Sequence, residues 1–310
     1  MFIKQLYKPK GSIPFYIKVR RFISKIIIKI IFFIFKDGAL RNSFFQLLKS
    51  YIQIKVNDNI LKFKDGNERL YLFLKVQFIV QKDLVNWIDT FNSKDIFYDI
   101  GSNIGMFSIY AAKKKIKTYC FEPHYSNLDD LQHNIYLNKV EDYINVIPLP
   151  LNETVKKVSI DLRDLTSSSA RNEISHLKSD YNNELKSVLK LNTISFSIKH
   201  LIKNNLILPP TKVKLDVDGV EFLILKGFED LLSSADEILL ELYEKEYDYW
   251  KYFKEYKNKK SINTKEIINN YFLNNNHKKN PYHDEIVNLL KDFKFNKSSE
   301  YGNNLLFKKS

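Results

Sequence analysis

The stretch over residues 96–105 constrains this chain more than any other, and it reads Ile-Phe-Tyr-Asp-Ile-Gly-Ser-Asn-Ile-Gly. Apolar and aromatic residues around Asp99 predict a buried strand, and the residues after Gly105 predict a helix. Two of only 8 glycines in the chain, Gly101 and Gly105, bracket the turn between these elements. Glycine permits a sharp turn and a close approach to a ligand, and the free N–H groups of a helix start favour anions. The stretch therefore predicts a loop that binds a nucleotide-type cofactor.

Glu122 adds a second signal for the class of cofactor. The Gly-x-x-x-Gly spacing of the turn does not match the Gly-x-Gly-x-x-Gly fingerprint of dinucleotide-binding folds, and no Gly-Lys-Ser/Thr follows it. Glu122 lies 23 residues after Asp99 and follows a predicted strand over residues 117–121. An acidic side chain at that position can accept hydrogen bonds from both hydroxyls of a ribose. The loop and Glu122 together predict a site for a cofactor that contains a nucleoside.

Strands and helices alternate through the middle of the chain, between residues 95 and 245. Further strands are predicted over residues 144–149, 188–196, 212–217 and 237–242, and a short hairpin over residues 155–162. This alternation predicts an α/β fold with a doubly wound, mainly parallel sheet, whose ligands bind beyond the carboxyl ends of the strands. Five polar residues lie at or just past predicted strand ends: Asp99, Glu122, Asn152, Asp216 and Glu241.

This arrangement resembles the FkbM family of S-adenosylmethionine-dependent methyltransferases. The matching segments are Tyr-Asp-Ile-Gly-Ser-Asn-Ile-Gly at 98–105, Phe-Glu-Pro at 121–123, Lys-Leu-Asp-Val-Asp-Gly-Val-Glu at 214–221, Leu-Lys-Gly at 225–227, Leu-Leu-Glu at 239–241 and Asn-Asn-Leu-Leu-Phe at 303–307. The resemblance implies a Rossmann-like fold of the class I methyltransferases and S-adenosylmethionine as cofactor. It also implies O-methylation of a hydroxyl of a sugar or glycan precursor.

The chain departs from the family pattern at two places. Asp218 stands where the family usually has Glu, and Phe196-Ser197 stand where it usually has Leu-Asp. The first change keeps the charge but shortens the side chain. The second removes a carboxylate, so a role for a charge at this position does not carry over.

The predicted site residues fall into two groups. The cofactor site is expected to contain Asp99, Gly101, Ser102, Asn103, Gly105, Glu122 and Asn152. For catalysis, Asp216 is a candidate base that takes the proton of the acceptor hydroxyl, and it is equally a candidate cap for the helix that follows. Glu241 and His176 are the next candidates for the base. No metal is expected, because the histidines near the C-terminus lack a ligand cluster with useful spacing.

The segment from Lys18 to Lys36 predicts a basic amphipathic helix, with lysines and Arg21 on one stripe and mostly Phe, Ile and Val around the rest. It is too short and too charged to span a membrane. Two interpretations stay open, docking on an anionic membrane surface and packing against the core or a partner. Alternating residues between 51 and 64 predict a β-hairpin. We expect an N-terminal module over residues 1–94 and a methyltransferase domain over residues 95–310.

Composition leaves several partners possible. The net charge of +13 favours anionic partners without choosing among them. A single cysteine, Cys120, excludes an internal disulfide and favours a reducing compartment, so we expect a cytoplasmic protein that could sit on the inner face of the membrane. Two other functions stay open, methylation of a nucleic acid and a non-catalytic scaffold. The basic residues are scattered, which disfavours the first, and the intact cofactor loop disfavours the second.

Overall fold

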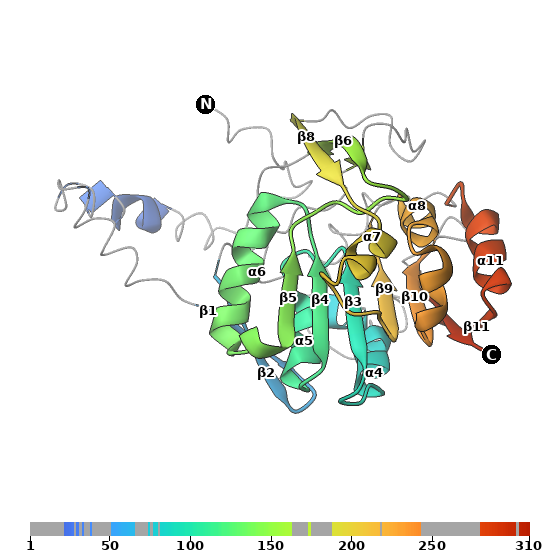
Figure 1. The fold of residues 1–310 in the computed structure, drawn as a ribbon. Helices are drawn as coiled ribbons and strands as arrows, with labels where there is room; N and C mark the ends of the chain where they lie inside the picture. Colours follow the sequence, from blue (N-terminus) through green and yellow to red (C-terminus); the bar gives the residue numbers. More distant parts are fainter. Residues whose placement is uncertain are drawn as a thin grey trace. The chain divides into compact units, whose positions relative to one another are not determined.

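The computed structural model of the chain (Figure 1) describes residues 22–27, 29–30, 33, 38, 51–65, 74, 77–79, 81–162, 173–174, 188–217, 219–242, 280–301 and 304–310. Contacts divide the chain into two compact units. Residues 1–50 and 263–274 form the first, and residues 51–262 and 275–310 form the second. Each unit is described by itself.

A seven-stranded sheet forms the centre of the second unit. Its strands are β3 (Ile96–Ile100), β4 (Lys117–Phe121), β5 (Ile144–Ile147), β9 (Lys212–Leu215), β10 (Glu237–Glu241), β11 (Phe295–Tyr301) and β12 (Asn304–Lys309). Their order is β11-β12-β10-β9-β3-β4-β5, and β12 runs opposite to the other six strands. The chain runs outward from β3 to β5 and then returns to β9, directly beside β3. The strand order therefore reverses between β3 and β9, where such sheets bind ligands. The predicted doubly wound α/β fold is confirmed.

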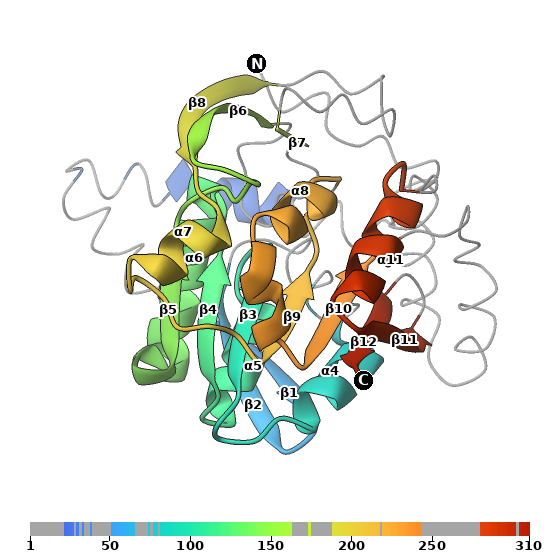
Figure 2. The same cartoon turned by 45° about the vertical axis from the view of Figure 1, so that its right-hand side comes forward.

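Helices cover both faces of this sheet. They are α4 (Lys82–Asp89), α5 (Met106–Lys113), α6 (Tyr125–Asn138), α7 (Ile198–Lys203), α8 (Glu221–Lys226) and α11 (His283–Asp292), with short 3-10 turns at Glu141–Tyr143 and Glu229–Ser234. Successive strand residues point to opposite faces, so Phe97 joins one hydrophobic cluster while Tyr98 and Ile100 join another. The first cluster packs α4, α5 and α6, and the second packs α7, α8 and α11, which lie on one side of the sheet in Figure 2.

The predicted hairpin near the start of the second unit is confirmed. Strands β1 (Tyr51–Val56) and β2 (Asn59–Lys64) pair antiparallel around Asn57, whose φ of 49° suits a tight turn. Every second residue of β1 is buried, and β2 lies against α6, where Asn134 and Asn138 accept hydrogen bonds from its backbone. Contacts place the hairpin in the same compact unit as the central sheet. A domain boundary at residue 94 stays a prediction.

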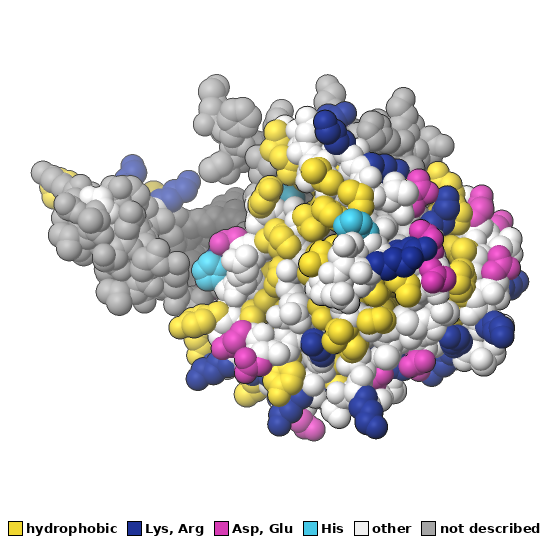
Figure 3. All heavy atoms as spheres, in the orientation of Figure 1, with side chains coloured by type: hydrophobic (Ala, Val, Ile, Leu, Met, Phe, Trp, Pro, Cys, Tyr) yellow, Lys and Arg dark blue, Asp and Glu magenta, His cyan; other side chains and the backbone are white. Residues whose placement is uncertain are grey.

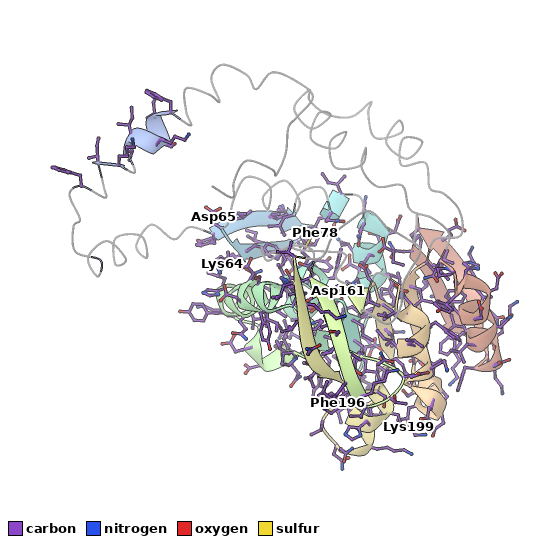
Figure 4. All side chains as sticks on the ribbon, turned by 90° about the horizontal axis from the view of Figure 1, so that it is seen from above. Lys64, Asp65, Phe78, Asp161, Phe196 and Lys199 are labelled. Carbon is purple, nitrogen blue, oxygen red and sulfur yellow. The ribbon has the colours of Figure 1, made fainter. Side chains whose placement is uncertain are left out.

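A small second sheet corrects one prediction. Strand β6 (Lys156–Leu162) pairs with β7 (Glu173–Ile174) and, over its whole length, with β8 (Leu189–Ser195). The hairpin predicted over residues 155–162 is therefore wrong, because a period-two pattern identifies a strand but not its partner. Both ribbon views place β6 and β8 beyond the carboxyl ends of β3, β4 and β9 (Figures 1 and 2). Seen from above, the two strands run from the Asp161 end to Phe196 (Figure 4).

The described residues of the first unit form helix over residues 22–27, 29–30 and 33. Their large apolar side chains are exposed, including Phe22 at 65% and Phe33 at 74%. Among the described residues, no helix has the length and apolar character needed to cross a membrane. The remainder of the segment from Lys18 to Lys36 lies outside the described residues.

Candidate active site

The glycine loop after β3 is held in a left-handed conformation that depends on its two glycines. Gly101, Asn103 and Gly105 have φ values of 80°, 51° and 84°. A Cβ on Gly101 would stand 1.9 Å from the backbone oxygen of Asp216, and one on Gly105 would stand 2.4 Å from Leu131 of α6. Glycine is therefore needed at position 101 because the loop packs against the chain that leaves β9. The contribution of Gly101 to cofactor binding stays a prediction.

Ser102 offers a direct test of whether this loop fits a cofactor. The residue is only 5% exposed, and its hydroxyl has no hydrogen-bond partner within the described part of the chain. Buried hydroxyls in folded proteins are nearly always hydrogen-bonded. An unpaired hydroxyl at the carboxyl edge of the sheet, beside the start of α5, fits a loop whose polar groups are completed by a bound molecule.

Glu122 joins the loop to the end of β4. One carboxylate oxygen accepts a hydrogen bond from the backbone N–H of Asn103 at 2.9 Å, and the other accepts one from His124 at 2.9 Å. Burial raises the pKa of Glu122 to about 7, although these two N–H donors and a hydrogen bond from the Asn127 side chain lower it. Each carboxylate oxygen can accept more than one hydrogen bond, so Glu122 retains capacity for ribose hydroxyls. The residue therefore shapes the loop and offers acceptors at the edge where a cofactor is expected.

Asp99 lies beneath the loop and is only 1% exposed. Its carboxylate accepts hydrogen bonds from the hydroxyl of Ser108 in α5 and from the ammonium of Lys214 at 3.0 Å. Burial alone would lower the pKa of Lys214, but the charges of Asp99 and Asp216 outweigh burial and leave that pKa raised. The contacts of Asp99 described here are internal. Its direct contact with a cofactor stays a prediction.

Asp216 lies one residue past β9, on the other side of the point where the strand order reverses. Its carboxylate pairs with the Lys214 ammonium at 3.3 Å and is 30% exposed. Leu215 pairs with Ile100 on one side and with Leu240 on the other, so the next residues along, Gly101 and Glu241, flank Asp216 at the edge of the sheet.

The interpretation of Asp216 as a helix cap is not supported by helix α8. That helix begins at Glu221, and its N-cap is Val220, which makes no side-chain cap hydrogen bond. Glu221 itself accepts a hydrogen bond from the backbone N–H of Gly219 at 3.0 Å, and Asn280 approaches its other oxygen at 3.3 Å. The loop before α8 is therefore braced by Glu221, and the role of Asp216 as a base stays a prediction.

The other predicted site residues have different positions. Glu241 ends β10 and pairs in register with Asn304. Asn152 is 2% exposed, and its side-chain oxygen accepts a hydrogen bond from the backbone of Glu153, so it supports the segment beside Gly227. Its role toward a cofactor stays a prediction. His176 and Asp218 lie outside the described residues.

Two residues that sequence reasoning did not place have clear structural roles. Lys214 pairs with Asp99, and this contact depends on the adjacency of β3 and β9. Ser197 is the N-cap of α7, accepting a hydrogen bond from the N–H of His200 at 3.2 Å. Asp and Ser are both favourable N-caps. The family's usual Asp at this position can therefore be replaced by Ser without loss of the cap.

No cluster of three or more potential metal ligands occurs among the described residues. His283 contacts Asp284 at 2.9 Å at the start of α11.

The comparisons with known proteins identify the family. A scan against protein-family models matches residues 97–297, more than half of the chain, to the methyltransferase FkbM domain. The chain belongs to the FkbM methyltransferase family. A domain of this family is a methyltransferase, and its cofactor is S-adenosylmethionine. The predicted family, enzyme class and cofactor are therefore confirmed.

Individual relatives share little sequence identity with this chain. The hexuronic acid methyltransferase AglP of Haloferax volcanii is 26% identical over 149 residues, which are 48% of this chain and 56% of the relative. This chain thus spans about half the length of that curated relative. Among solved structures, methyltransferase FkbM from Methylobacillus flagellatus KT matches with a TM-score of 0.40 and 13% identity, over 70% of this chain and 44% of that chain. Precorrin-6y C5,15-methyltransferase from Geobacter metallireducens GS-15 matches with a TM-score of 0.36 and 12% identity, over 75% and 88%. The family assignment rests on the family model and not on these structures.

Proposed function

We propose that this chain transfers a methyl group from S-adenosylmethionine to a hydroxyl of a sugar or glycan precursor. The observation that supports it most is the convergence of three features where the strand order reverses. These are the glycine loop with its unpaired Ser102 hydroxyl, the Glu122 carboxylate at the next strand end, and the Asp216 carboxylate across the reversal.

The residues divide the work between binding and proton transfer. The buried Ser102 hydroxyl would hydrogen-bond the polar end of the cofactor, and Glu122 would accept the ribose hydroxyls. When bound, S-adenosylmethionine supplies an activated methyl group. Positioning the acceptor in line with that group supplies much of the rate. Asp216 would accept the proton of the acceptor hydroxyl as the methyl carbon exchanges its bond to sulfur for one to the acceptor oxygen. This proton transfer would add about 10²–10⁴-fold to the rate.

The acceptor class follows from the curated relative. That relative is a hexuronic acid methyltransferase, so we take a uronic acid within a polysaccharide precursor as the first acceptor to test. On the face shown in Figure 3, basic and acidic side chains are interspersed, without the continuous basic strip that nucleic-acid binding favours. A glycan acceptor is therefore preferred to a nucleic acid.

A panel of acceptors tests the proposal. The protein is incubated with methyl-labelled S-adenosylmethionine and, in separate reactions, with glucuronic acid oligosaccharides, neutral oligosaccharides of equal length, nucleotide sugars, lipid-linked sugars and RNA. Label in a sugar product that resists mild base, as an ether does and an ester does not, supports O-methylation of a hydroxyl. Label in RNA alone, or cofactor binding without transfer to any sugar, would overturn it.

We also propose that the N-terminal helix holds the protein on an anionic membrane surface at the cytoplasmic side. Supporting this, Lys25 and Lys29 accompany exposed apolar side chains in the described part of the helix: Phe22, Ile23, Ile26, Ile27, Ile30 and Phe33. A basic amphipathic helix of this kind lies in the interface of anionic lipids. Such a location would bring the domain close to lipid-linked glycan precursors.

A further inference from the structure

We propose that Lys214 is a positioning residue that fixes the cofactor loop and the proton-accepting carboxylate of Asp216 in one geometry. The assignment of Asp216 as base rests on the proposed function above. The contacts that link Lys214 to the two halves of the site do not depend on it.

The three contacts of the Lys214 ammonium span the site. It donates to Asp99 at 3.0 Å and to the backbone oxygen of Gly101 at 3.5 Å, and it pairs with Asp216 at 3.3 Å. An ammonium has three hydrogens and no acceptor, so these three oxygens can use its full capacity. Its side chain is only 3% exposed, and Asp99 is 1% exposed. The group is therefore an internal link and not a solvated surface charge.

The position of this link in the sheet explains its importance. Lys214 of β9 pairs in register with Asp99 of β3, at the place where the strand order reverses. The half of the sheet on the β3 side carries the cofactor loop and Glu122, and the half on the β9 side carries Asp216. Reacting groups must be held within a fraction of an ångström for efficient transfer. A buried ammonium between the two halves supplies that constraint.

Two carboxylates share this one ammonium, and their environments differ. Asp99 is sealed beneath the loop, while Asp216 is 30% exposed at the edge of the sheet. When Asp216 takes up a proton, Lys214 keeps Asp99 as a counter-ion and is not left as an isolated buried charge. Asp99 therefore serves as the permanent partner of Lys214, and Asp216 is the carboxylate that can change its charge during a reaction cycle.

The neighbouring strands place few other titratable groups near Lys214 and Asp99 among the described residues. Cys120 pairs with Asp99 from the opposite strand, β4, and burial raises the pKa of its thiol. Burial is the main cause of the raised pKa of Glu122, and the negative charge of Asp99 raises this pKa further. On β10, the residue beside Lys214 is the apolar Leu239. Among these neighbours, Lys214 is therefore the cation that contacts both aspartates.

The experiment compares three variants with the wild-type protein. Lys214→Met removes the ammonium and keeps the length of the side chain. Asp99→Asn combined with Lys214→Met removes the buried pair together, so that no uncompensated charge threatens folding. Lys212→Met is the matched control, because Lys212 is a buried lysine two residues earlier on the same strand that pairs with Glu237 at 3.3 Å, away from the site.

Two readouts separate positioning from general structure. The first is the titration midpoint of the Asp216 carboxyl in the protein alone, followed by carbon NMR with Asp216→Asn for assignment. We expect Lys214→Met to raise this midpoint by about 1–3 pH units, because a cation within a few ångströms stabilises the carboxylate. The double variant should raise it by less, because it also removes the negative charge of Asp99, and Lys212→Met should leave it unchanged. The second is the rate of methyl transfer at saturating cofactor, which should fall by about 100-fold or more in the Lys214 variants and little in the control.

The outcomes distinguish this inference from the proposed function. A folded Lys214→Met protein with an unchanged Asp216 midpoint would overturn the role of Lys214. If that variant does not fold, a folded double variant with an unchanged midpoint and a wild-type rate of methyl transfer would overturn it. An equal shift in Lys212→Met would also overturn it, since the effect would then be general. A wild-type protein that transfers no methyl group to any acceptor would reject the proposed function, while the NMR midpoints would still decide whether Lys214 links the two halves.

Discussion

The raised pKa of Glu122 makes cofactor affinity depend on pH in a defined direction. The carboxyl has a pKa of about 7 in the folded protein, against an ordinary value of 4.5, and burial is the main cause. Hydrogen bonds from ribose hydroxyls favour the carboxylate over the neutral acid. Cofactor binding should therefore strengthen as the pH rises through about 7. If only the carboxylate form binds, the affinity increases about tenfold between pH 6 and pH 8.

Glu122→Gln removes this dependence while preserving size and shape. The amide cannot ionise, so the affinity of the variant should be flat relative to the wild type over the same range. At pH 8 it should be weaker by about 1.5–3 kcal/mol, the usual value of hydrogen bonds to a charged group. Calorimetric titration of S-adenosylmethionine at pH 6, 7 and 8 measures both effects. The variant shares every other titrating group, including those of the cofactor, so the difference between the two proteins isolates Glu122.

The raised pKa of Glu122 also affects the stability of the cofactor-free protein. Its free energy of unfolding should fall as the pH rises, whereas cofactor affinity should increase. The folded state binds its proton more tightly than the unfolded state, so the contribution of Glu122 to stability is lost as the pH rises from about 4.5 to about 7. The difference between these pKa values corresponds to about 3 kcal/mol. In urea denaturation, the free energy of unfolding of Glu122→Gln relative to the wild type should increase by up to about that amount between pH 5 and pH 8. Wild-type affinity that is constant from pH 6 to pH 8, together with unchanged relative stability, would refute this reasoning.

Four further predictions address other parts of the molecule. Asp216→Asn should bind cofactor normally and lose turnover by about 10²-fold or more; turnover near the wild-type rate would remove Asp216 as the base. Gly101→Ala should lower stability by about 2–3 kcal/mol and weaken cofactor binding in parallel, since its Cβ would stand 1.9 Å from a backbone oxygen; unchanged thermal stability would contradict this packing. In sedimentation with vesicles, the protein should bind anionic but not neutral lipid and lose binding when Lys25 and Lys29 become Glu; equal binding to both lipids would reject membrane docking. In urea denaturation, Ser197→Ala should lower the free energy of unfolding by about 1 kcal/mol and Ser197→Asp by much less; no loss in Ser197→Ala would show that the α7 cap contributes nothing.

The features recognised from sequence are those whose signals lie close together along the chain. The β3 strand, its glycine turn and the start of α5 follow one another within a few residues, and Glu122 lies at the next strand end. Each of these elements forms where the local pattern predicts it. The alternation of strands and helices likewise sets the class of fold, because few arrangements can bury such a pattern.

The features that were missed depend on which strands become neighbours. The partner of β6 is β8, separated from it by a long segment that gives no pairing signal. Strand β11 was not predicted because its sequence, Phe-Asn-Lys-Ser-Ser-Glu-Tyr, is polar and lies at the edge of the sheet. The pairing of Lys214 with Asp99 requires β9 to return beside β3, which the alternation of strand residues alone does not specify.

The contact between Gly101 and Asp216 joins the two halves of the site into one structural unit. The left-handed glycine allows the loop to approach the backbone of Asp216, and the Lys214 ammonium contacts Gly101, Asp99 and Asp216 together. A change in the loop must therefore move the segment that carries the proposed base, and a change beside the base must move the loop. Residues that share partners in this way have non-additive effects. The strand reversal consequently does more than provide space for a cofactor, because it makes the geometry of binding and the geometry of proton transfer depend on the same few contacts.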